Sequence, residues 1–198
     1  MKRKILSLLL ILICIPVGML AQNLRGDGLK SSIVNYEMTS QGMKVPIIEY
    51  RDNYGKSVCT KMTIMGSDMG YIMNGEKAYM VYYSQKQYME LPRPKDEINY
   101  NEMTPEAIEK YKIKATGTGE FLGKNCTIYS SEMESEGTTF QLEAWVYKGI
   151  VLKAIAKTDK GVVDERIATS IEENPAIPAS TFEIPEGYSK MALPMPQN

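Results

Sequence analysis

Histidine is absent from this 198-residue chain. Ser-His-Asp and Cys-His nucleophilic sites need histidine as the general base, and imidazole metal sites need it as a ligand, so these kinds of site are excluded. The chain also shows no glycine-rich phosphate loop ahead of a helix, and no basic stripe with interleaved aromatic residues. We therefore predict a protein that is not an enzyme, has no catalytic residues, cofactor or metal, and does not bind nucleic acid.

Long hydrophobic runs are scarce, and the clear case lies at the N-terminus. Residues 5–15 are apolar except for Ser7, follow three basic residues at positions 2–4, and lead to a turn-prone exit that ends at Ala21. This pattern predicts a secretory signal peptide over residues 1–21, with cleavage after Ala21 and export of the mature chain. The run is too short for a spanning helix. A retained N-terminal anchor is the alternative.

Cysteine is also rare. Cys14 belongs to the predicted signal peptide, so Cys59 and Cys126 remain in the mature chain, each in a strand-like stretch. An even pair of cysteines in an exported protein can form a disulfide. Their spacing in the sequence does not show whether the two Cα atoms come close enough to be bridged. A Cys59–Cys126 disulfide and two buried free thiols therefore both stay open.

The chain does contain a regular succession of strands and turns. Gly137, Gly149 and Gly161 lie twelve residues apart and separate stretches rich in β-branched and aromatic residues. Glycine supplies the positive φ that a two-residue hairpin turn needs. Strands of this length at regular spacing predict a continuous antiparallel sheet.

The N-terminal half carries the same signals. Asn74-Gly75 is the strongest hairpin signal in the chain. Before it, Val58, Thr60, Met62 and Ile64 alternate with Cys59, Lys61, Thr63 and Met65, which places the first set on one face of a strand. Residues 77–84 are apolar on both faces, so we expect a helix, a second sheet layer or a ligand to cover each face.

One helix has a clear start signal. Thr104 can cap it, Pro105 suits the first helical position and Glu106 favours the positive end of the dipole. We expect this helix to cover residues 105–114 and to pack Ile108 and Tyr111 onto the sheet. No domain boundary is visible, so we predict a single domain over residues 22–188. A short edge strand at 181–184 and a flexible tail at 189–198 follow.

Two groups of side chains raise the question of a metal site. Glu132, Glu134 and Glu136 share one strand face, as in a calcium site or a carboxylate pair. A solvated hairpin end is favoured because no ligand-spaced Asp/Asn run accompanies them. A methionine-rich segment could bind Cu(I), whereas we favour an adaptable apolar surface, either core or the lining of a cavity. Its methionines are Met62, Met65, Met69, Met73 and Met80.

The C-terminal half carries a family resemblance. Its motifs are residues 119–129 (GEFLGKNCTIY), 145–153 (WVYKGIVLK), 168–171 (ATSI) and 182–188 (FEIPEGY). In this order they resemble exported Gram-negative proteins of unknown function related to the LolA/LolB lipoprotein-carrier superfamily. The resemblance extends over most of the mature chain in layout.

The resemblance implies a mainly β fold with few helices. In that fold a single curved antiparallel sheet forms an unclosed barrel, a LolA-like half-barrel, with a helix covering it. It further implies a periplasmic location and a concave apolar cavity that accepts lipid or lipoprotein acyl chains. Candidates for the arginine with which the carriers hold their lid are Arg51, Arg93 and Arg166, although none lies in a recognisable motif.

Strand alternation, with the row from Val58 to Ile64 facing inward, then selects the ligand-binding residues. They are Val58, Met62, Ile64, Met80, Tyr82, Trp145 and Leu152. Burial of acyl methylenes would contribute roughly 0.8 kcal/mol each. A carrier of this kind is our first hypothesis. An envelope structural or interaction protein with a filled core is the second, and Met-based Cu(I) handling the third. We expect a monomer, with an envelope protein as a further partner.

Overall fold

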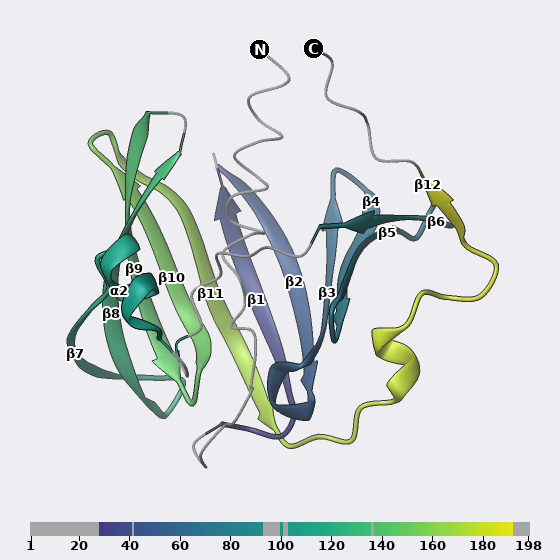
Figure 1. Cartoon of the computed structure of the whole chain (residues 1–198), viewed down its shortest axis with the longest axis horizontal. Helices are drawn as coiled ribbons and strands as arrows, with labels where there is room; N and C mark the ends of the chain where they lie inside the picture. The colour runs from purple at the N-terminus through teal and green to yellow at the C-terminus, as the bar shows by residue number, and fades with distance from the viewer. Residues whose placement is uncertain (1–27, 41, 93–99, 101–102, 136, 192–198) are drawn as a thin grey trace.

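The computed structural model describes residues 28–40, 42–92, 100, 103–135 and 137–191, so the predicted signal peptide lies outside the described part. Its strands form one curved strip (Figure 1). The strands are β1 (Ser32–Ser40), β2 (Met43–Asp52), β3 (Ser57–Ile64), β4 (Ser67–Asn74), β5 (Lys77–Tyr82), β6 (Gln87–Leu91), β7 (Lys114–Phe121), β8 (Lys124–Ser135), β9 (Thr138–Tyr147), β10 (Ile150–Thr158), β11 (Gly161–Glu173) and β12 (Ser189–Met191). The helical elements are α2 (Pro105–Lys110) and the 3-10 turns η1 (Asn53–Gly55) and η2 (Ala179–Phe182).

The sheet has two halves that meet at β1. Its order is β12-β6-β5-β4-β3-β2-β1-β11-β10-β9-β8-β7, and neighbours run antiparallel except for β12, which pairs parallel with β6. β1 to β6 form one meander and β7 to β11 the other. The β1–β11 ladder joins them. Since β7 and β12 stand at opposite ends of the order, the sheet is not closed into a barrel, as the family resemblance implies.

The turns between strands follow the predicted glycines. At the β9–β10 turn, Lys148 has φ 46° and Gly149 has φ 78°. Two successive positive φ values are typical of the type I′ turn, whose twist matches that of the flanking strands. Gly149 therefore fixes the register in which β9 and β10 pair.

Strand register divides the sheet into two faces. The Tyr36 face carries Val34, Tyr36, Met38, Val45, Ile47 and Met62, which alternate along β1, β2 and β3. All six are buried and belong to one hydrophobic cluster. The Cys59 face carries Cys59, Ile72 and Val81 from β3, β4 and β5, which form a second cluster with Phe182.

The C-terminal segment, residues 174–188, packs on the Cys59 face beside β3 and β4 (Figure 1). It brings Phe182, Ile177, Ile184 and Tyr188 against the second cluster. The sequence predicts that β5 is covered on both faces, but on this face the cover is an irregular segment and not a helix, sheet layer or ligand.

Two expectations for the end of the chain are wrong. The edge strand expected at 181–184 does not form, because η2 occupies this stretch and the prolines around it cannot donate to a ladder. Residues 189–191, expected to begin a flexible tail, instead form β12 and pair with β6. The Ser189 N–H also donates to the Lys86 carbonyl at 3.0 Å, which ties the start of β12 to the sheet.

The predicted helix is shorter than expected. α2 begins at Pro105 with Thr104 as its cap, since the Thr104 hydroxyl accepts from the Ala107 N–H at 3.2 Å. It ends at Lys110, and Lys112 has φ 48°, a left-handed conformation that stops the helix before β7 begins at Lys114. None of its residues is buried, so the described residues do not show a helix that covers the sheet. Among these residues, no helix is long and apolar enough to cross a membrane.

Candidate functional site

Five of the seven predicted ligand-binding residues lie in the first half of the sheet, and these five share the Tyr36 face. Val58, Met62 and Ile64 alternate along β3, and pairing through β4 puts Met80 and Tyr82 of β5 on the same side. Val58, Met62 and Met80 are buried, whereas Ile64 and Tyr82 are half-buried. The alternation used to select these residues therefore agrees with the strand register.

The other two residues come from the second half of the sheet. Leu152 lies at the register shift between β9 and β10, is fully buried and belongs to the same cluster as Met62. Trp145 is half-buried and packs against that cluster. Ala144, the residue before Trp145, pairs with Ala154. The pairing of β10 with β11, and of β11 with β1, places Ala154 and therefore Ala144 on the Tyr36 face. The structure thus brings Leu152 to the Tyr36 face, whereas Trp145 contacts the cluster from a strand position that faces the other way.

A buried polar cluster interrupts the apolar Tyr36 face. Arg166 Nη2 donates to Glu49 Oε2 at 2.6 Å, and Arg51 Nη1 lies 3.4 Å from Glu49 Oε1. The Arg166 guanidinium also stacks 3.8 Å above the Tyr36 ring, and the Tyr36 hydroxyl donates to the Val151 carbonyl at 3.1 Å. Each charged member is at most 6% exposed. Buried charges need such pairing, because desolvation of an isolated ion costs several kcal/mol.

This cluster contains two of the three candidate arginines, while Arg93 lies outside the described residues. Burial is the main cause that raises the pKa of Tyr36 well above its usual range, and the nearby charge of Glu49 is the second cause. The Tyr36 hydroxyl therefore stays protonated and acts as a donor. Sequence reasoning did not single out Glu49. The available signal is that Glu49 and Arg51 continue the row of Val45 and Ile47, at positions where alternation predicts apolar side chains.

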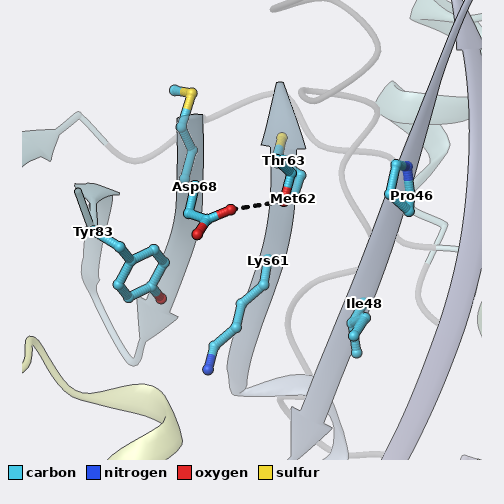
Figure 2. Close-up of a pocket in the computed structure, with 8 residues that line it drawn as sticks. Pro46, Ile48, Lys61, Met62, Thr63, Asp68 and Tyr83 are labelled. Carbon is cyan, nitrogen blue, oxygen red and sulfur yellow. Dashed lines mark hydrogen bonds between the residues drawn. The ribbon is translucent and has the colours of Figure 1, made fainter. Parts of the chain in front are cut away.

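A pocket of about 350 Å³ opens on the sheet at β2, β3 and β4. Figure 2 shows Pro46 and Ile48 on one side, Lys61 in the middle, and Asp68 with Tyr83 on the other side. Thr63 Oγ1 donates to Asp68 Oδ1 at 2.7 Å, and Met62 and Met69 complete the lining. Pro46, Ile48 and Lys61 alternate with the buried row, so this pocket is on the Cys59 face.

The structure does not gather the side chains proposed for metals. Within the described ranges, no group of three or more Cys, Asp or Glu side chains is placed to hold a metal ion. Glu132 pairs with Lys112, and Glu136 lies outside those ranges. Met62 and Met69 pair across β3 and β4, whereas Met65 lies in a turn and is 83% exposed. The five methionines therefore do not form one site.

Cys59 and Cys126 are both free and buried in the structure. Cys59 is on β3 in the cluster beneath the C-terminal segment, and Cys126 is on β8. Five strands separate β3 from β8 in the sheet. Burial raises the pKa of Cys59 from 9.0 to about 11 and also raises that of Cys126. Neither thiol is therefore activated as a nucleophile.

The open, curved sheet and its apolar Tyr36 face define a LolA-like fold. The fold matches an uncharacterized conserved protein from Thermus thermophilus with a TM-score of 0.60 and 9% identity, covering 83% of this chain and 91% of that one. It also matches MucB in the Pseudomonas aeruginosa MucA/MucB complex with a TM-score of 0.51 and 10% identity, covering 79% of this chain. The chain spans only 56% of that MucB chain. At 9% and 10% identity these likenesses support the expected LolA-like fold and show the fold alone.

The protein belongs to the DUF4412 family, a domain of unknown function whose pattern matches residues 17–161. No curated protein matches the chain. The family match covers β1 to β10, so it includes most of the Tyr36 face and all eight residues that line the pocket of Figure 2.

Proposed function

We propose that this chain is an exported, non-enzymatic binding protein of the periplasm that holds an apolar ligand, a lipid or lipoprotein acyl chain, against the Tyr36 face. The observation that carries this proposal is the apolar row on that face, in which Met62, Met38 and Leu152 are buried in one hydrophobic cluster and Met80 is buried on the same face. The LolA-like fold supports it. Flexible thioethers along this row suit a binding surface that adapts to acyl chains of different shape.

The buried polar cluster offers such a ligand a fixed point. Arg166 Nε is buried and has no hydrogen-bond partner among the described residues, although Nη2 of the same guanidinium is paired with Glu49. An unsatisfied buried donor costs about 1–3 kcal/mol. A carbonyl or phosphate oxygen of a lipid would satisfy it, with the acyl chain extending along the methionines. A bound lipid would then be held by apolar burial along the chain and by one hydrogen bond near its head.

Uptake of a fluorescent fatty acid or phospholipid by the delipidated mature chain, residues 22–198, tests this proposal. We expect saturable uptake, and we expect Ile64→Gln to weaken it because Ile64 is half-buried on the Tyr36 face. Val162→Gln is the matched control, since Val162 is 59% exposed on β11. Circular dichroism confirms that both variants are folded. Delipidated protein that takes up neither probe would contradict the carrier function.

One observation favours the second hypothesis, an envelope interaction protein with a filled core. Val34, Met38 and Leu152 on the Tyr36 face have no exposed surface. MucB, which shares the fold, has been solved in complex with MucA, so a protein partner is a further outcome to consider. A chain that takes up no lipid, yet resists proteolysis and unfolds cooperatively, would support this alternative.

A further inference from the structure

The pocket of Figure 2 opens on the Cys59 face at Pro46, Ile48 and Lys61, the face opposite the proposed lipid site, whereas Met62 and Met69 of its lining belong to the Tyr36 face. Its volume of about 350 Å³ is at the small end of ligand pockets, which run from about 300 to 1,000 Å³. Proline, isoleucine, methionine and a tyrosine ring supply most of its walls. A pocket of this size and composition suits a short apolar group.

One wall of the pocket is fixed in place by several contacts. The Tyr83 N–H donates to the Asp68 carbonyl at 3.1 Å, and the Tyr188 hydroxyl donates to the Tyr83 carbonyl at 3.4 Å. The Tyr83 and Tyr188 rings meet edge to face at 6.3 Å. Gly70 leaves room for the Tyr83 ring, since a Cβ at that position would lie 2.6 Å from the Tyr83 hydroxyl oxygen. The wall is therefore preorganised by β4 and the C-terminal segment.

The two charged side chains of the pocket, Lys61 and Asp68, differ in whether a polar group of the protein already contacts the charge. The Lys61 ammonium lies 5.5 Å from the Tyr50 ring centroid and 5.8 Å from that of Tyr83, and no carboxylate of the described residues forms an ion pair with it. The Asp68 carboxylate already accepts a hydrogen bond from Thr63. Figure 2 shows the Lys61 ammonium extending away from Asp68 toward the Tyr83 side. An incoming anion would meet Lys61, and a second negative charge would be repelled by Asp68.

We infer that this pocket binds a small amphiphile with a single negative charge, a medium-chain monocarboxylate, with its carboxylate on Lys61 and its tail against Pro46 and Ile48. The ammonium and the carboxylate form a charge-assisted hydrogen bond, the stronger class of such bonds. The rings of Tyr50 and Tyr83 position the ammonium beforehand. This site does not depend on the proposed lipid site of the Tyr36 face.

Calorimetric titration of the delipidated mature chain with decanoate, and with decanol as the neutral probe, tests the inference. We expect decanoate to bind roughly tenfold more tightly than decanol, because a hydrogen bond to a charged group is worth at least that factor. Lys61→Gln should remove this preference while decanol binding persists. The control is Lys157→Gln, which removes an exposed lysine of β10 and should leave both affinities unchanged.

Three results would overturn the inference: no decanoate binding, equal affinity for decanoate and decanol, or an unchanged preference in Lys61→Gln. Ile64→Gln separates the two sites, because Ile64 lies on the Tyr36 face. Decanoate binding that is lost in Ile64→Gln and kept in Lys61→Gln would reject the pocket and support the lipid site. Binding that is lost only in Lys61→Gln, in a chain that takes up no phospholipid, would support the pocket and reject the lipid site.

Discussion

The two ends of the sheet differ in how much of each strand the rest of the chain covers. At the β3–β6 end, Val58, Cys59 and Thr60 are all buried although they alternate between faces, because the C-terminal segment covers the Cys59 face. At the other end, the first five residues of β7 are all exposed. The comparison shows that a strand needs apolar residues on both faces only where a second layer, even an irregular one, packs against it.

The largest effect on stability should come from a change at Phe182, the buried residue that anchors the C-terminal segment to the Cys59 face. Phe182 is 4% exposed and packs against Cys59, Ile72 and Val81. We expect Phe182→Ala to lower the free energy of unfolding by about 3–5 kcal/mol, because it deletes a buried ring and leaves a cavity. Urea unfolding of the mature chain measures this change.

The matched change at the other end is Ile108→Ala on α2, where the isoleucine is 41% exposed. We expect a loss within about 0.5 kcal/mol, as for most surface substitutions. Similar losses for the two variants would mean that the C-terminal segment contributes no more to stability than α2 does.

A smaller effect should appear at alkaline pH. Burial raises the pKa of Cys59 from 9.0 to about 11, so the folded state holds the thiol proton more tightly than the unfolded state does. Unfolding then releases a proton above pH 9, and the free energy of unfolding should fall by about 1.4 kcal/mol per pH unit between pH 9 and about 11.

Unfolding measured across this range in wild type, Cys59→Ala and Cys126→Ala checks the assignment. The additional slope should disappear in Cys59→Ala and persist in Cys126→Ala. If all three proteins show the same slope, the titrating group is not the Cys59 thiol, and the C-terminal segment does not exclude water from it.

The smallest effect compares two glycines. A Cβ on Gly70 would lie 2.6 Å from the Tyr83 hydroxyl oxygen, whereas one on Gly117 in β7 would meet nothing within 4 Å. We expect Gly70→Ala to cost about 1 kcal/mol, at the low end for overpacking, because the new Cβ meets the outer end of one side chain and no backbone atom. Gly117→Ala should be neutral or stabilising by up to about 1 kcal/mol. Thermal unfolding distinguishes them, and equal stabilities would show that Tyr83 is not held in place.

The sequence predicted the antiparallel sheet well because its signals are local. The period of two in β3 and the glycine turn at 148–149 depend only on neighbouring residues. The same alternation groups Met62, Ile64 and Met80 on one face, in agreement with the register. The face of Trp145 could not be predicted in this way. Its relation to the face of Met62 passes through the β9–β10, β10–β11, β11–β1, β1–β2 and β2–β3 ladders, and no local pattern records it.

Other features were missed for the same physical reason. Glu49 meets Arg166 only because β1 lies between β2 and β11, and the irregular cover of β5 comes from a segment about 100 residues further along the chain. The helix was predicted too long because the left-handed Lys112 carries no glycine or proline signal. Long-range pairing therefore limits what local patterns can predict here.

The β1–β11 ladder has a consequence for how the protein matures. A chain that emerges N-terminus first presents β1 early. One edge of β1 pairs with β11, which is among the last strands to appear. Until then β1 offers unpaired amide and carbonyl groups beside Val34 and Met38, a template for misassociation between molecules. Helper proteins that shield nascent chains would be needed most during this interval, and an agent that occupies this edge would block assembly without touching the finished molecule.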